Sequence, residues 1–167
     1  MKRIFYLMSV FLTLSTFGLR AQSYGTAAGV RIGDGIGLTV QQQIGEKATL
    51  EMIAESAFKS KDVTFSAIYE RHANIIPFVR MLNVYYGGGP HFKSVSANST
   101  EKNGYGVTAI VGAELKLGNF LFSVDFKPLM NVSGGTGFFE TQKGFSVRYV
   151  LLDRIKSFSL LDRLKKF

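Results

Sequence analysis

Apolar and polar residues alternate along much of this chain, and this alternation predicts β-strands that have one apolar and one polar face. The clearest example spans residues 36–44. One face carries Ile36, Leu38, Val40 and Ile44 together with Gln42, and the other carries Gly37, Thr39, Gln41 and Gln43. The same alternation returns in residues 105–116, 120–127 and 145–149, and a less regular pattern marks 24–32, 47–58, 63–72 and 82–93. The pattern therefore predicts eight strands.

Turn-forming residues separate these segments and predict how the strands are connected. Gly33-Asp34-Gly35 and Gly118-Asn119 are short enough to join neighbouring strands as hairpins. Longer polar stretches at 59–62, 98–104 and 133–137 separate other pairs. Such connections favour antiparallel, up-and-down strand order. We therefore predict an all-β fold, an antiparallel barrel of about eight strands.

The first 21 residues have the pattern of a secretory signal peptide. A basic start, Met1-Lys2-Arg3, precedes an apolar run over residues 4–17, and Ala21 supplies a small residue for cleavage. The apolar run falls short of the roughly 20 residues that span a bilayer as a helix. The chain contains no Cys, so neither a lipid anchor on an N-terminal Cys nor a disulfide framework is predicted. We expect residues 1–21 to be removed on export.

The formal net charge of +8 is unevenly distributed along the chain. Without the predicted signal peptide it is +5, and residues 152–167 hold +3 of this, so the body from 22 to 151 is nearly neutral. A nucleic-acid-binding protein would gather basic residues on one face of a cytoplasmic domain. We expect no nucleic-acid partner.

The C-terminal segment has a different period from the rest of the chain. Leu151, Ile155, Phe158, Leu161 and Leu164 recur at three- and four-residue steps, whereas the basic residues fall mostly between them. This predicts a basic amphipathic helix over residues 152–167. Such a helix could lie on an anionic membrane leaflet or cover one end of the barrel.

Charged residues occupy the middle of the predicted strands, on the face opposite the apolar one. The nine residues are Arg31, Glu51, Glu55, Glu70, Glu114, Lys116, Asp125, Lys127 and Arg148. An eight-stranded barrel is just wide enough to be filled by side chains, so opposite charges inside it would pair. In a soluble barrel the same residues would face water. The pattern favours a transmembrane barrel with a charged interior.

Aromatic residues near the predicted strand ends also favour a membrane location, because girdles of aromatic residues are typical of membrane barrels. The candidates are Tyr24, Phe58, Tyr85, Tyr86, Phe92, Tyr105, Phe120, Phe138, Phe139 and Tyr149. Core packing would also explain them.

Several short motifs occur in an order and spacing that resemble small outer-membrane β-barrel proteins, the porin-like superfamily of Gram-negative bacteria. They are Tyr85-Tyr86-Gly87-Gly88-Gly89-Pro90-His91-Phe92, Gly112-Ala113-Glu114-Leu115-Lys116, Ser123-Val124-Asp125-Phe126-Lys127-Pro128 and Phe145-Ser146-Val147-Arg148-Tyr149. The resemblance covers residues 24 to about 150. It implies insertion by the outer-membrane assembly machinery and carries no active site. The chain departs from the family by continuing for eighteen residues beyond Tyr149.

The sequence offers little for catalysis or metal binding. His72 and His91 stand apart, with no local Ser–His spacing that would pair a nucleophile with a base. Two isolated histidines without Cys give no zinc-ligand pattern. Glu51 and Glu55 would lie about 13 Å apart along one strand face, too far to share an ion. Residues 87–90 lack the Lys-Ser/Thr ending of a phosphate loop and are expected to bend or bulge a strand.

These observations together lead to one expected function and two alternatives. We expect a non-enzymatic, monomeric outer-membrane barrel without a cofactor, surrounded by outer-membrane lipids, with a structural or surface-interaction role and no wide pore. The first alternative is a soluble periplasmic barrel that binds a small apolar ligand, as lipocalin-type folds do. The second alternative is a narrow channel.

Overall fold

The computed structural model describes residues 24–59, 62–74, 82–95, 103–135 and 137–152. Eight β-strands cover most of these residues and form one closed barrel. They are β1 (Thr26–Gly33), β2 (Gly35–Gln43), β3 (Ala48–Ala57), β4 (Val63–Asn74), β5 (Leu82–Ser94), β6 (Gly104–Leu117), β7 (Phe120–Ser133) and β8 (Phe139–Leu152). The prediction of a closed antiparallel eight-stranded barrel is confirmed.

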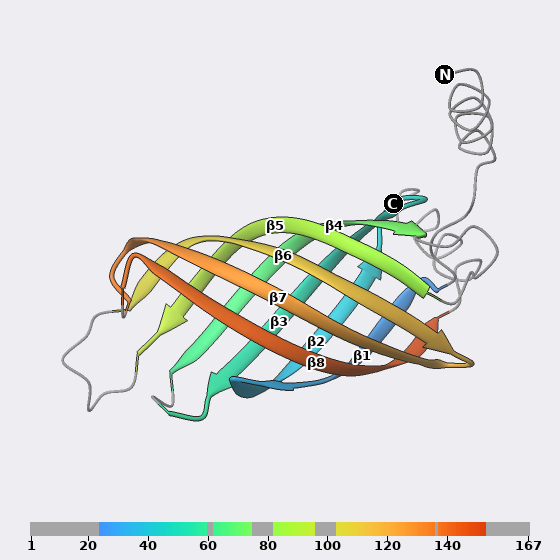
Figure 1. Cartoon of the computed structure of the whole chain (residues 1–167), viewed down its shortest axis with the longest axis horizontal. Helices are drawn as coiled ribbons and strands as arrows, with labels where there is room; N and C mark the ends of the chain where they lie inside the picture. The colour runs from blue at the N-terminus through green and yellow to red at the C-terminus, as the bar shows by residue number, and fades with distance from the viewer. Residues whose placement is uncertain (1–23, 60–61, 75–81, 96–102, 136, 153–167) are drawn as a thin grey trace, which may run out of the picture.

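Each strand pairs antiparallel with the strands before and after it in the chain, and β1 pairs with β8 to close the barrel. Figure 1 shows the first strand, in blue, beside the last, in red, with all strands tilted around a common axis. In the register that closes the barrel, Val30 lies opposite Val147 and Gly33 lies opposite Gly144. Closure leaves no free edge along the paired part of the sheet.

The two ends of the barrel are defined by the turns. β1 begins and β8 ends at one end, which also carries the β2–β3 and β6–β7 turns; we call it the termini end. The other end, the loop end, carries the β1–β2 turn at Asp34 and the connections from β3 to β4, β5 to β6 and β7 to β8. Gly118 opens the β6–β7 turn with a φ of 60°, a backbone conformation that suits glycine.

Six of the eight strands lie close to their predicted bounds, whereas β7 and β8 are longer than predicted. β7 continues to Ser133 and β8 begins at Phe139. The alternation in β8 is obscured because its outward face carries Thr141 and Lys143 near the loop end, so that both faces are polar there. Pairing with β7 nevertheless holds this segment in the sheet, from Asp125↔Gly144 to Met130↔Phe139.

The Gly87–Pro90 segment lies inside β5 and interrupts its pairing with β4 without shifting the register. Pairing runs to Ser66↔His91 and resumes at Tyr69↔Gly88. Proline has no backbone N–H and cannot donate to the ladder, which accounts for a gap at this position.

The predicted signal peptide (1–21) and all but the first residue of the predicted C-terminal helix (152–167) lie outside the described residues. Leu152 is the last residue of β8. The domain boundaries at 21/22 and 151/152 therefore stay predictions. Among the residues that the structure describes, no helix is long and apolar enough to cross a membrane.

Candidate functional site

The inside of the barrel is polar and the outside is apolar, the reverse of a soluble protein. Within the described part of the chain, buried polar and charged residues outnumber buried hydrophobic ones. Large apolar side chains instead face outwards: Leu38 is 64% exposed, Val107 is 54% exposed and Val124 is 55% exposed. The interior is therefore the first candidate for a functional site, and the outer surface is the second.

Eight of the nine charged residues singled out in the sequence are buried inside the barrel. They are Arg31, Glu51, Glu55, Glu70, Glu114, Asp125, Lys127 and Arg148. Lys116 is half-buried near the termini end, two residues along β6 from Glu114. Six of the eight buried residues form two ion-paired clusters, centred on Arg31 and on Arg148.

The Arg31 cluster joins three strands that are not neighbours in the sheet. The Arg31 guanidinium on β1 donates to both carboxylate oxygens of Asp125 on β7, at 2.6 and 2.7 Å, and its Nε donates to Glu55 Oε2 on β3 at 2.9 Å. Lys127 Nζ lies 3.5 Å from the same Glu55 oxygen, and the Tyr85 hydroxyl donates to Asp125 at 3.1 Å. Two cations and two carboxylates balance each other, which is what makes burial of these charges tolerable.

The Arg148 cluster lies nearer the termini end. Arg148 on β8 forms an ion pair with Glu51 on β3, and it donates to the hydroxyls of Thr39 at 3.1 Å and Ser123 at 2.7 Å. Glu51 also accepts a hydrogen bond from Thr39. The guanidinium thereby connects β8 with β2, β3 and β7, so its contacts also cross the lumen.

Two further carboxylates belong to the Arg148 side of the interior and are held by neutral donors. Glu70 accepts a 3.1 Å hydrogen bond from the Gln41 amide. The Tyr24 hydroxyl lies 2.8 Å from Glu114 Oε2 and 2.8 Å from Gln41 Oε1, so its single proton serves one of them at a time. Burial of Tyr24 inside the barrel corrects its assignment to an aromatic girdle.

A third cluster at the loop end was not foreseen from the sequence. Lys93 Nζ on β5 lies 2.8 Å from Glu140 on β8 and 3.7 Å from Asp62, the residue that precedes β4. The side-chain amide nitrogen of Asn131 donates to Glu140 at 2.8 Å, and the side-chain oxygen Oδ1 of Asn131 lies 2.9 Å from His91 Nε2. Glu140 lies in a segment for which the sequence pattern predicted no strand. Its position on the inner face could therefore not be predicted.

The two histidines lie in different surroundings. His72 Nε2 contacts the Thr49 hydroxyl at 2.7 Å, and its ring stacks on Tyr85 with centroids 5.5 Å apart. Ser66 lies opposite His91 across β4 and β5, but their side chains form no hydrogen bond. A Ser nucleophile needs a base within hydrogen-bond reach, and the described residues contain no such pair at either histidine. No cluster of three His, Cys, Asp or Glu in the described ranges is arranged to hold a metal ion.

The predicted girdle aromatics divide between the two faces of the barrel. Tyr85 is fully buried in the interior beside Ile53, Ile68 and Ile110, so it is not a girdle residue. Apart from Tyr24 and Tyr85, the predicted girdle residues face outwards: Phe58, Tyr86, Phe92, Tyr105, Phe120, Phe138, Phe139 and Tyr149.

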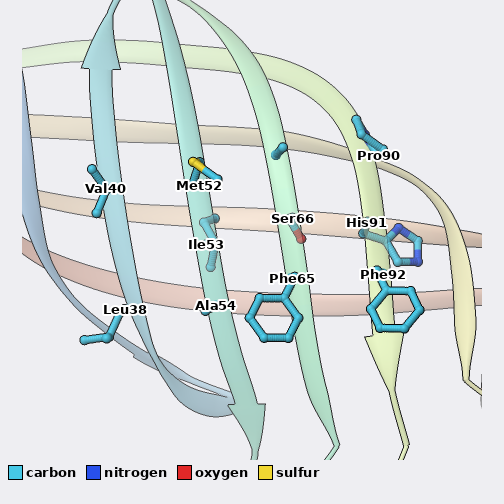
Figure 2. Close-up of a pocket in the computed structure, with 11 residues that line it drawn as sticks. Leu38, Val40, Met52, Ile53, Ala54, Phe65, Ser66, Pro90, His91 and Phe92 are labelled. Carbon is cyan, nitrogen blue, oxygen red and sulfur yellow. The ribbon is translucent and has the colours of Figure 1, made fainter.

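A hollow of about 550 Å³ lies on the outer face over β2, β3, β4 and β5. Figure 2 shows the rings of Phe65 and Phe92 side by side at one end of it, with Leu38 on β2 at the other side. The small side chains of Ala54 and Ala67 lie between these larger residues and leave the hollow open. Its outward-facing lining is apolar throughout.

Comparisons with known proteins identify the fold. No protein-family model matches the sequence, and neither does any curated protein. Among solved structures, the N-terminal β-barrel domain of Pseudomonas aeruginosa OprF is similar, with a TM-score of 0.56 and 16% sequence identity over 77% of this chain and 98% of that domain.

Two further solved structures are similar. One comes from the de novo design of transmembrane β-barrels, with a TM-score of 0.52 and 15% identity over 77% of this chain and 97% of that one. The other is the outer membrane protein OprG from P. aeruginosa, with a TM-score of 0.46 and 13% identity over 78% of this chain and 88% of that one. The OprF domain and the designed barrel confirm the resemblance to small outer-membrane β-barrel proteins at the level of the fold, a closed antiparallel barrel of eight strands.

Proposed function

We propose that this chain is a non-enzymatic outer-membrane β-barrel protein with a structural or surface-interaction role, a side-chain-filled interior and no wide pore. The observation that carries the proposal is the reversal of polarity, with ion-paired residues inside and an outer surface that is apolar except near its ends. In a bilayer the outer face of a barrel contacts lipid, whereas the inner face is shielded from it. The same distribution would leave a soluble protein with a large apolar surface in water.

Contacts across the lumen support a filled interior. The neighbours of β1 in the sheet are β2 and β8, yet Arg31 on β1 binds Glu55 on β3 and Asp125 on β7. Lys127 and Glu55 likewise approach each other from β7 and β3. Side chains that meet in this way occupy the cross-section of a narrow barrel.

A soluble barrel for a small apolar ligand is the weaker candidate. Such a protein needs an apolar cavity inside, as lipocalin-type barrels have. Here the interior holds Arg31, Arg148 and their carboxylate partners at the positions where an apolar ligand would lie. An interior filled with charged side chains offers an apolar ligand few favourable contacts.

Cell fractionation followed by gel electrophoresis tests the proposal. The mature protein should be found in the outer-membrane fraction and should migrate differently on a detergent gel before and after heating, because a membrane barrel stays folded in detergent until it is heated. Recovery in the soluble periplasmic fraction, without this shift, would contradict the proposal. A version ending at Leu152 should show whether residues 153–167 affect insertion.

A further inference from the structure

A second hollow, of about 660 Å³, lies on the outer face over β6, β7, β8 and β1. Unlike the first hollow, it has a basic side chain in its lining, Lys143 on β8. The register places Val111, Phe126 and Lys143 in one row across three strands. The next outward-facing row toward the termini end contains Ala113, whose small side chain leaves the hollow open.

The other outward-facing side chains of this lining are apolar, and the carboxylate of Asp125, which also belongs to the lining, points into the barrel and binds Arg31. Val124 is 55% exposed and Phe145 is 44% exposed, and they lie opposite each other on β7 and β8. Ile32 on β1 continues the same row next to Phe145. The outward-facing part of the hollow is therefore an apolar trough beside Lys143. A smaller hollow that also contains Leu115 and Phe122 continues it past Ala113 and Val124 toward the termini end.

The Lys143 ammonium is exposed and makes no ion pair with any residue that the structure describes. Its backbone N–H donates to the Asp34 carboxylate at 2.8 Å, which places Lys143 level with the β1–β2 turn at the loop end. A Lys on the lipid face of a barrel is strongly unfavourable at the bilayer midplane and tolerated near the interface. This position therefore places a cation at headgroup depth above an apolar trough.

We propose that this hollow binds an anionic phospholipid, with the phosphate at Lys143 and an acyl chain along Ala113 and Val124. The inference rests on the proposed membrane location and adds a specific lipid site to it. Charge complementarity selects an anionic headgroup, because a zwitterionic lipid carries no net charge for Lys143 to neutralise. The trough fixes the lipid next to the cation instead of leaving it free in the bilayer.

The first hollow, shown in Figure 2, supplies the matched control. It also has small residues between large ones, but its outward-facing lining contains no charged side chain. His91 belongs to that lining by position, yet its side chain is buried inside the barrel. We expect the first hollow to take acyl chains without preference for the headgroup.

Native mass spectrometry of the folded mature protein tests the site. The protein would be refolded in detergent and given dioleoylphosphatidylglycerol or dioleoylphosphatidylcholine, and the number of retained lipids would be compared. Unmodified protein should retain phosphatidylglycerol about fivefold better, the preference expected for one basic residue near a lipid phosphate. Lys143→Gln and Ala113→Phe should each remove the preference.

Two control variants should leave the preference for phosphatidylglycerol unchanged. Arg71→Gln removes an outward basic residue at the opposite end of the barrel, and Ala54→Phe fills the first hollow. Equal retention of both lipids by the unmodified protein, or equal loss in Arg71→Gln and Lys143→Gln, would overturn the inference. The gel shift on heating is measured in the same samples. If the shift is present without a lipid preference, the lipid site fails and the membrane barrel stands; if the protein never inserts, the proposed function itself fails.

Discussion

Arg31 fits inside the barrel because its neighbour on β8, Gly144, has no side chain. A Cβ atom built at Gly144 would lie 2.1 Å from Arg31 Cζ. Gly112 makes room in the same way for Tyr85, whose hydroxyl binds Asp125. These glycines therefore shape the lumen for the large polar side chains that fill it.

Gly144→Ala should push the Arg31 guanidinium away from Asp125 and Glu55. We expect a loss of about 1–3 kcal/mol in the free energy of unfolding, the usual effect of overpacking a filled interior. Urea unfolding in lipid vesicles measures this loss. Gly137→Ala, where nothing lies within 4 Å of the new methyl group, should have little effect. Equal stability of the two variants would show that Arg31 can move freely.

Arg31→Met removes the guanidinium and leaves Asp125 and Glu55 with Lys127 as their remaining cation. Breaking a buried ion pair by removing one partner costs about 3–5 kcal/mol. The outward-facing Arg71→Met should change the free energy of unfolding by less than about 1 kcal/mol, the range for a basic residue near the membrane interface. Similar unfolding curves for the two variants would contradict the assignment of Arg31 to a buried cluster.

At the scale of the elements, alternation in the sequence was enough to locate all eight strands and their order, because the outer face is apolar almost everywhere along them. It failed for the loop-end halves of β7 and β8. In β8, Thr141 and Lys143 face outwards while Glu140 and Gln142 face inwards, so both faces are polar. In β7, the apolar Leu129 faces inwards between Pro128 and Met130, so the alternation is lost there as well. Pairing with β7, which no local pattern encodes, keeps this segment of β8 extended.

The β6–β7 hairpin depends on glycine at one position. Gly118 has a φ of 60°, so Gly118→Ala should destabilise the barrel by about 1–2 kcal/mol, the cost of a left-handed conformation for a residue with a Cβ atom. The same change at Gly45 in the β2–β3 turn, where the new Cβ would meet only the Ala48 side chain at 3.4 Å, should be nearly neutral. Denaturant unfolding of both variants side by side gives the comparison, and a larger loss at Gly45 would refute the argument from backbone conformation.

At the scale of the whole molecule, the sequence indicated which charged residues share a face, but it could not say which of them meet. Arg31 and Asp125 are 94 positions apart and come from strands that are not neighbours. Their contact depends on the tilt and stagger of all eight strands. For the same reason, alternation does not indicate that Thr39 and Ser123 complete the Arg148 cluster, that Tyr24 contacts Glu114, or that Lys93 reaches Glu140.

The filled lumen predicts the electrical behaviour of the purified protein. Planar bilayers containing it should show no large, steady single-channel conductance, because Arg31 and Arg148 with their partners cross the interior. A stable, water-filled conductance would contradict the filled interior and favour the channel alternative.

The central claim is that the apolar face lies in lipid and the polar face lies inside, and single-cysteine labelling tests it most directly because the chain has no native Cys. Val124 faces outwards, whereas Ser146 is buried and its hydroxyl makes no hydrogen bond within the described part of the chain. In vesicles, Val124→Cys should react with a thiol reagent attached to lipid, and Ser146→Cys should stay protected until the protein is unfolded. Reaction of Val124→Cys with a water-soluble reagent alone, or labelling of Ser146→Cys from the lipid, would contradict the account.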